Sequence, residues 1–339
     1  MNPSRCVEHP AVWRRGAANW PVCEWTPETL ADRAGDARVS VARSAHDRFD
    51  YDPRSGRTFE TRTTSVRDAL SSVLLAAEGG PREYLMQQPL VQVCAALLAD
   101  LRVEELSPHA DARGAHLWVG GPGIVTPLHY DPVHNFYVQA YGSKRVLLYD
   151  PEDLDGLYPF PMASPSPHIS HVDPEAPDRA RYPAFASLGA WEAVLEPGDV
   201  LVLPAFWWHH VRSVEPSISI SLWSAPRLEH CMNATGWRLF RSIHELGSLG
   251  SMGAPLRGYP GGLVGASRLA LRMGQPRFAA LLIAAAVDAQ LREMDDRERA
   301  WWQGPLALLE RWQVETPPAS ATEDIGRWLG ALTEDPSTV

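Results

Sequence analysis

From about residue 115 to about residue 225 the sequence consists of short apolar runs separated by Gly, Pro and Asp. The runs include HLWVGG, NFYVQAYG, KRVLLYDP and SISISLWS, and EPGD at 196–199 marks a turn between two further runs. Apolar runs of this length, bounded by turn residues, are typical of antiparallel strands in a sandwich or barrel. The sequence therefore predicts a mainly β core, to which the rest of the chain is an addition.

The sequence on either side of this core has a different texture. Residues 1–110 mix irregular Arg- and Asp-rich stretches with helix-like segments such as TSVRDALSSVLLAAEGG, which ends at a Gly-Gly stop. After residue 226 apolar residues recur at helical spacing, as in FAALLIAAAV and RERAWWQGPLALLERW. We predict an N-terminal elaboration at 1–110, the β core at 111–226 and a C-terminal helical region at 227–339.

Composition argues against several classes of protein. The 339 residues carry a formal net charge of -10 without a dense run of Lys or Arg, so we expect no nucleic-acid partner. FAALLIAAAV is too short to span a membrane, and the first residues lack the pattern of a secretory signal. The cysteines form no CxxC pair, which suits reduced thiols in a cytoplasmic protein; they are Cys6, Cys23, Cys94 and Cys231.

His129 and Asp131, in TPLHYD, lie two residues apart. On an extended strand, side chains at i and i+2 leave from the same face, so this imidazole and carboxylate can converge on one point. His209, which follows EPGDVLVLPAFWW, is the candidate for a third ligand. Two histidines and one carboxylate form the facial triad of non-haem Fe(II) oxygenases, which leaves coordination positions open for a 2-oxo acid and O2.

The chain contains a single lysine, Lys144, and every other basic residue is arginine. A 2-oxo acid bound at the triad would present its distal carboxylate several ångströms from the metal, where a cation is required. Lys144 follows Asp131 past a YG turn, and we expect it on the strand that neighbours the HxD strand. A compact ammonium on a slim stem fits a narrow barrel better than a planar guanidinium does.

Taken in order, these motifs resemble those of the JmjC or cupin-like Fe(II)- and 2-oxoglutarate-dependent oxygenases. Within that family the chain is similar to the asparaginyl hydroxylase that inhibits hypoxia-inducible factor and to the JmjC arginyl hydroxylases. The resemblance covers roughly residues 10–226 and rests on WRRGAANWPVCEW, TPLHYDPVHNFYVQAYGSKRVLLYD and LEPGDVLVLPAFWWHHV. It implies a double-stranded β-helix, or jelly roll, which agrees with the strand pattern. It also implies C-terminal helices that form a homodimer.

The resemblance assigns roles to individual residues. Those that match the iron ligands are His129, Asp131 and His209. Those that match positions around 2-oxoglutarate are Lys144, which pairs with its C5 carboxylate, and Thr126, Asn135, Ser221 and Tyr84. A gapless match of REYLMQQPL places Leu85 there instead of Tyr84. Because a slip of one residue changes the face of a strand, this choice stays open.

The activity implied is hydroxylation of a C–H bond, coupled to decarboxylation of 2-oxoglutarate to succinate and CO2. A protein or peptide side chain is the expected substrate, because the enzymes that the chain resembles act on such substrates and the Pro-rich loop at 159–183 is long enough to cover an extended chain. However, its PSPHI stretch lacks the Arg-Gln pair with which the asparaginyl hydroxylase grips its substrate.

Several alternatives remain. A small metabolite or a biosynthetic peptide is the alternative substrate, and JmjC demethylation of methyl-lysine is less favoured because no histone-reader module accompanies the domain. A noncatalytic metal-binding cupin and a zinc cupin, such as a sugar isomerase, are alternatives from other classes. The triad and Lys144 speak against both.

Four other histidines lie near these motifs. His210 adjoins His209, and neighbours on a strand point to opposite faces, so only one of the two should face the metal. His134 is interpreted as a rim or packing residue. His168 and His171 lie in the long loop, where a surface position is favoured and contact with substrate is the alternative.

Overall fold

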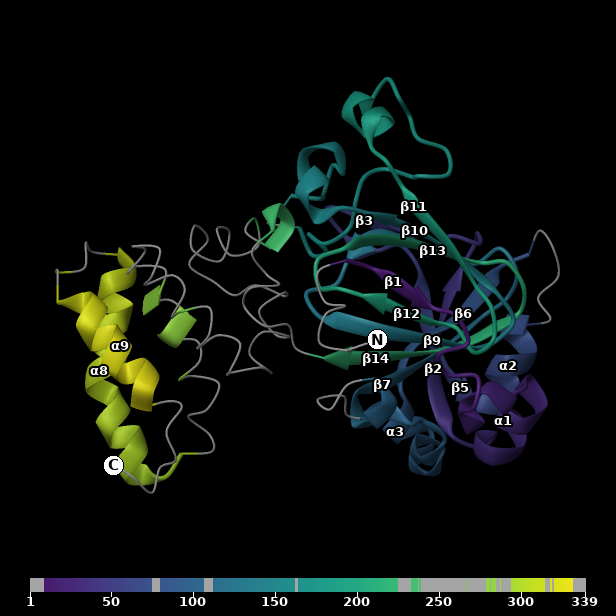
Figure 1. Cartoon of the computed structure of the whole chain (residues 1–339), viewed down its shortest axis with the longest axis horizontal. Helices are drawn as coiled ribbons and strands as arrows, with labels where there is room; N and C mark the ends of the chain where they lie inside the picture. Colours follow the sequence, from purple (N-terminus) through teal and green to yellow (C-terminus); the bar gives the residue numbers. More distant parts are fainter. Residues whose placement is uncertain are drawn as a thin grey trace. The chain divides into compact units, whose positions relative to one another are not determined.

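Two antiparallel sheets form the β core in the computed structural model (Figure 1). The larger sheet has eight strands in the order β1-β12-β9-β14-β7-β6-β2-β5, and the smaller has four in the order β11-β10-β13-β8. A separate hairpin joins β3 and β4. This arrangement confirms the predicted double-stranded β-helix, or jelly roll.

The strands have the following bounds: β1 Ala11–Trp13, β2 Arg38–Ser44, β3 Tyr51–Asp52, β4 Gly56–Arg57, β5 Glu60–Ser65, β6 Arg82–Pro89, β7 Ala115–Gly120, β8 Val125–Tyr130, β9 His134–Tyr141, β10 Lys144–Tyr149, β11 Trp191–Leu195, β12 Val200–Leu203, β13 Trp208–Ser213 and β14 Ser217–Ser224. The α-helices are α1 Pro27–Ala34, α2 Val66–Leu74, α3 Leu90–Cys94, α8 Asp296–Val314 and α9 Ala321–Ala331. Short 3-10 helices lie at Pro21–Glu24, Ala95–Asp100, Val103–Glu105, Ala112–Gly114, Pro151–Gly156 and Pro183–Ser187.

The structure describes residues 9–74, 80–106, 112–161, 164–224, 233–236, 238, 267, 279–280, 282–284, 287, 294–314, 318 and 320–331. The described residues up to 224, with 233–235, form one compact unit, and the described residues from 236 onward form a second. Strands β2, β5 and β6 from the N-terminal part join the larger sheet of the core. The predicted boundaries at 110 and 226 stay predictions.

The sequence SISISLW shows why β14 takes its place in the larger sheet. Its apolar residues Ile218, Ile220 and Leu222 belong to the core cluster that also contains Leu30 of α1 and Leu70 of α2. The alternating serines leave from the opposite face, toward the smaller sheet, because strand side chains alternate with a period of two. Helices α1 to α3 therefore cover the outer face of the larger sheet, and the face that lines the interior of the barrel is polar at β14.

Two turns rely on glycine. Gly142 connects β9 of the larger sheet to β10 of the smaller one with a φ of 63°, and a Cβ there would lie 1.9 Å from the carbonyl oxygen of Pro216. Gly198, in the predicted EPGD turn, has a φ of 91°, and the backbone N–H of Asp199 donates to the carbonyl of Glu196 at 2.9 Å. Left-handed backbone of this kind favours glycine.

Helices α8 and α9 belong to the second unit, and the rings of Trp312 and Trp328 stack at 5.5 Å. Within the predicted helix FAALLIAAAV, residues 279–280, 282–284 and 287 are described, and they are helical. None of the described helices is long and apolar enough to cross a bilayer. Cys23 and Cys94 are free thiols, whereas Cys6 and Cys231 lie outside the described residues.

Candidate active site

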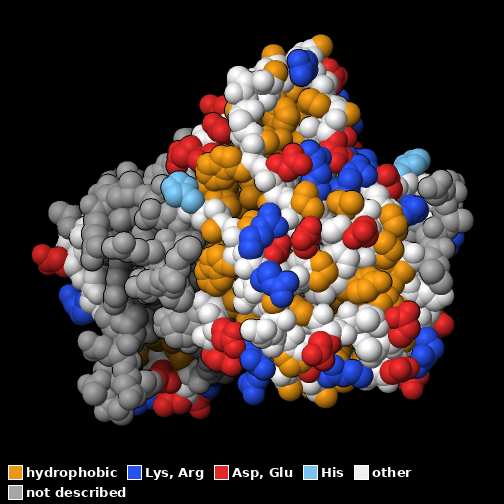
Figure 2. All heavy atoms as spheres, turned by 45° about the vertical axis from the view of Figure 1, so that its right-hand side comes forward, with side chains coloured by type: hydrophobic (Ala, Val, Ile, Leu, Met, Phe, Trp, Pro, Cys, Tyr) orange, Lys and Arg blue, Asp and Glu red, His pale blue; other side chains and the backbone are white. Residues whose placement is uncertain are grey.

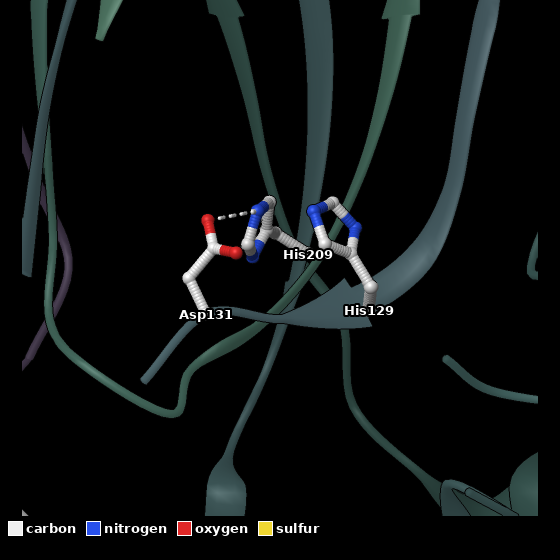
Figure 3. A group of neighbouring side chains, drawn as sticks. All are labelled: His129, Asp131 and His209. Carbon is white, nitrogen blue, oxygen red and sulfur yellow. Dashed lines mark ion pairs between the residues drawn. The ribbon is translucent and has the colours of Figure 1, made fainter. Parts of the chain in front are cut away.

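Two strands of the smaller sheet bring the candidate metal ligands together. His129 lies on β8, Asp131 directly follows that strand, and His209 lies on β13, where it is the cross-strand partner of His129. The two imidazole centroids are 4.0 Å apart, and Nε2 of His209 is 3.8 Å from Oδ2 of Asp131. One donor atom from each residue lies within 4.8 Å of the other two. Figure 3 shows the three side chains converging, as the HxD spacing predicts.

Backbone contacts orient both imidazoles. Nδ1 of His129 lies 2.8 Å from the carbonyl oxygen of Pro127, and Nδ1 of His209 lies 3.0 Å from that of Trp207. A carbonyl oxygen can only accept, so Nδ1 carries the hydrogen and Nε2 keeps its lone pair. Burial, together with the nearby His129, holds the pKa of His209 well below its usual value. Imidazoles oriented this way, with Nε2 free to donate its lone pair, are suited to bind a metal ion.

The chemistry of the donor set fits Fe(II). Two imidazole nitrogens and one carboxylate on one side leave the other coordination positions open, as in non-haem iron oxygenases. The metal ligands line a cavity together with Asn135 and Ser221, and the Asn135 amide nitrogen lies 3.4 Å from the Ser221 hydroxyl oxygen. The amide oxygen of Asn135 is buried and lacks a hydrogen-bond partner among the described residues. A buried polar atom of this kind calls for an explanation, and a bound ligand would provide one.

A cavity of about 100 Å³ extends from the metal ligands into the interior of the barrel. Tyr84 and Thr126 both line it, with the two hydroxyl oxygens 3.5 Å apart. Leu85 packs instead into the apolar cluster on the outer face of the larger sheet. The structure therefore places Tyr84, and not Leu85, at the cavity.

Lys144 is completely buried between the sheets, and its ammonium donates to the hydroxyl of Tyr137 at 2.7 Å. Nζ also lies 5.7 Å from the ring centroid of Tyr84, and both tyrosines line the cavity. Burial lowers the pKa of Lys144 from 10.5 to about 7. No carboxylate pairs with this lysine within the part of the chain that the structure describes.

The strand order corrects one expectation about Lys144. We predicted that its strand would neighbour the HxD strand, but β13 lies between β8 and β10. The chain leaves β8 for β9 in the larger sheet and returns to the smaller sheet only at β10. Because the chain crosses from one sheet to the other at these points, β8, β9 and β10 do not pair with one another.

The long loop passes over the metal ligands. His168 lines the cavity, and its ring centroid is 6.4 Å from that of His129. Burial lowers its pKa to about 4, so the imidazole is neutral at physiological pH. His171 packs against Phe160 at 4.5 Å and stacks on Tyr182 at 6.4 Å, away from the cavity. The favoured expectation of a surface position is therefore wrong for His168.

His210 points away from the metal site, as strand parity predicts. It belongs to a second group with Asp173 and Glu175, in which Arg212 donates to both carboxylate oxygens of Glu175. This cluster lies on the outer face of the smaller sheet, and it fastens the long loop to β13. Sequence analysis missed it, because the acidic residues and the arginine are far apart in the chain. His134 accepts a hydrogen bond from the backbone of Ala205 at 3.0 Å, which agrees with a packing role.

A family model described as a cupin-like domain matches residues 4–229. The chain belongs to this family. Jumonji C domain-containing protein 5 of Drosophila melanogaster is 38% identical over 146 residues, which cover 42% of this chain and 36% of that protein. Lysine-specific demethylase 8 of Xenopus tropicalis is 29% identical over 221 residues, or 64% of this chain and 48% of that protein.

A third relative differs in its name from these two. It is tRNA wybutosine-synthesizing protein 5 of Danio rerio, 28% identical over 231 residues, which cover 63% of this chain and 68% of that protein. The matches confirm the predicted JmjC or cupin-like family. This cupin-like chain spans less than half the length of the first two relatives.

Proposed function

We propose that this cupin-like chain is an Fe(II)- and 2-oxoglutarate-dependent oxygenase that hydroxylates a C–H bond of a protein or peptide side chain. The observation that carries the proposal is Lys144, a buried amine that donates to Tyr137 of the cavity wall and has no carboxylate partner among the described residues. An unpaired buried cation is costly, so it is retained where a ligand supplies the opposite charge.

Each residue of the cavity has a part in this proposal. His129, Asp131 and His209 would hold the iron, and Lys144 would pair with the C5 carboxylate of 2-oxoglutarate. Thr126 and Tyr84 would offer hydroxyls to that carboxylate, and Asn135 and Ser221 would offer further polar atoms, because all four residues line the cavity. The bound iron, with 2-oxoglutarate and O2, would supply oxidation of an unactivated C–H bond, coupled to formation of succinate and CO2.

The chain itself contributes orientation and exclusion of water. Backbone carbonyls fix both imidazoles, and the tyrosine rings around Lys144 keep its ammonium desolvated, which strengthens its attraction for a carboxylate. Apolar side chains such as Val146 and Leu201 form part of the cavity wall. A dry, preformed cavity protects a reactive oxidant from water.

The relatives leave the substrate class open. Two are named as a Jumonji C protein and a lysine-specific demethylase, and one is named for synthesis of a tRNA base. A protein or peptide substrate is supported by the long loop over the cavity. On the face in Figure 2, acidic and basic side chains are interspersed, so this face does not form the basic patch that is typical of RNA-binding surfaces.

Anaerobic addition of Fe(II) and 2-oxoglutarate tests the proposal through the visible charge-transfer band of the chelate. We expect the band with the wild type, its loss in His209→Ala, and a much higher 2-oxoglutarate requirement in Lys144→Ala. Arg145→Ala is the matched control, because Arg145 is the next residue of β10 and pairs with Glu192 at 2.8 Å on the outer face. Iron binding without a band would favour the noncatalytic cupin instead.

A further inference from the structure

The segment His168–Ser170 is attached to the strand that carries the metal ligands. The backbone N–H of Tyr130 donates to the carbonyl of His168 at 3.1 Å, and the N–H of Ser170 donates to that of Leu128 at 2.9 Å. Ile169 forms an isolated antiparallel bridge with His129. Because only backbone atoms are involved, residue 168 is held beside the metal ligands whatever its side chain.

The imidazole of His168 is not used by the proposed binding of iron or 2-oxoglutarate. It lines the cavity among aromatic rings, with the ring centroid of Tyr51 at 6.4 Å and that of Tyr130 also at 6.4 Å. Its Nδ1 is buried and makes no hydrogen bond within the described part of the chain. A polar ring at the mouth of a site, with an unsatisfied nitrogen, suits a contact with a bound molecule.

The charges around the cavity limit what can enter it. Among its described lining residues there is no Lys or Arg, and the carboxylate present is that of Asp131, a proposed iron ligand. Lys144 lies behind Tyr137 and would be neutralised by the cosubstrate. Asp173 and Glu175 are already paired with arginines on the outer face of the sheet. A cationic or anionic side chain would therefore lose its hydration without gaining a partner.

We infer that His168 determines substrate specificity and that the side chain it receives is uncharged and hydrogen-bonding, an amide or a hydroxyl. The inference rests on the proposed hydroxylase function and deepens it. Within the described residues, a lysine or arginine substrate would find aromatic faces, such as those of Trp118 and Trp223, but no free carboxylate. Cation–π recognition of methyl-lysine by these rings is the competing outcome.

The test uses the full chain loaded anaerobically with Fe(II) and 2-oxoglutarate, so that the charge-transfer band reports the intact site before any peptide is added. Short peptide pools are then added, each with one fixed central residue: Asn, Gln, Ser, Thr, Lys, Arg, trimethyl-lysine, Asp or Glu. The shift of the band gives the half-saturating peptide concentration, and aerobic succinate formation gives the stimulated rate. The variants are His168→Phe, His168→Asn and, as the control from the same loop, His171→Phe.

We expect pools with an amide or hydroxyl residue to shift the band and stimulate succinate formation, and charged pools to do neither. His168→Phe should raise the half-saturating concentration about tenfold, as for loss of one hydrogen bond. His168→Asn should recover part of this loss, and His171→Phe should match the wild type. Preference for Lys, Arg or trimethyl-lysine, an unchanged response of His168→Phe, or a band that no neutral pool shifts would overturn the inference. Absence of the band itself would refute the proposed function instead.

Discussion

Replacing Lys144 with methionine should stabilise the unliganded protein, although it removes a proposed ligand-binding residue. The folded-state pKa of about 7 lies below the ordinary lysine value of 10.5, so folding disfavours the protonated amine. Between these two values the unfolded chain binds more protons than the folded one, and stability therefore rises with pH. This difference in pKa corresponds to a destabilisation of the folded protein by ~5 kcal/mol as an upper bound. The destabilisation is present in full below pH 7.

Urea denaturation at a series of pH values from 6 to about 10.5 measures this effect. Without ligand, the free energy of unfolding of Lys144→Met should exceed that of the wild type by several kcal/mol near pH 6. Loss of the hydrogen bond to Tyr137 reduces this gain by about 1 kcal/mol. The gap should close as pH rises toward 10.5. Arg145→Met serves as the control, because arginine does not titrate in this range and its offset should not change with pH.

Ligand should narrow the difference in stability between the two proteins. Mn(II) with 2-oxoglutarate at about a hundred times its Kd should stabilise the wild type by about 2.7 kcal/mol, whereas Lys144→Met should gain far less. A wild type whose stability does not change between pH 7 and 10 would show that the amine is not desolvated as the structure indicates. An equal gain from 2-oxoglutarate in both proteins would refute the role of Lys144.

Two further predictions concern the cavity and the turn before Lys144. Tyr84→Phe should weaken 2-oxoglutarate binding roughly fivefold, by about 1 kcal/mol, because the hydroxyl is lost, whereas Leu85→Met should not change it. Titration of the charge-transfer band measures both variants. An equal loss of affinity in Leu85→Met would contradict the placement of Tyr84 at the cavity. Gly142→Ala should destabilise the protein by about 2–4 kcal/mol, because its Cβ would meet the Pro216 carbonyl oxygen, whereas Gly189→Ala, with open space around it, should be close to neutral in urea denaturation.

The sequence predicted the convergence of the candidate metal ligands because a local rule sufficed. Side chains at i and i+2 of a strand share a face, and this alone brings His129 beside Asp131. The same alternation separates His209 from His210. The Tyr84 position could not be decided from sequence, because register determines the face and REYLMQQPL fits two registers. The structure shows a register shift in β6 between Leu85 and Gln88, directly after the residues in question.

Features that depend on the three-dimensional path of the chain were not predictable in the same way. The pairing of β10 with β13 instead of β8 follows from jelly-roll crossovers between sheets. The cluster of Asp173, Glu175 and Arg212 joins a loop to a strand, and no periodic pattern signals it. His168 looked like a surface residue because its Pro-rich loop gives no sign that the backbone will pair with β8.

Because backbone atoms join the long loop to β8, the choice of side chain at position 168 is independent of the position of the metal ligands. Residue 168 can be exchanged in evolution without disturbing the metal ligands. The hydrogen bonds that Tyr130 and Ser170 make between β8 and the loop involve backbone atoms and do not depend on the side chain at 168. A scaffold with this property can change the molecules it accepts by single substitutions while the proposed iron ligands stay in place. For an engineer, position 168 is therefore the place at which a small library of variants should change which molecules the cavity accepts.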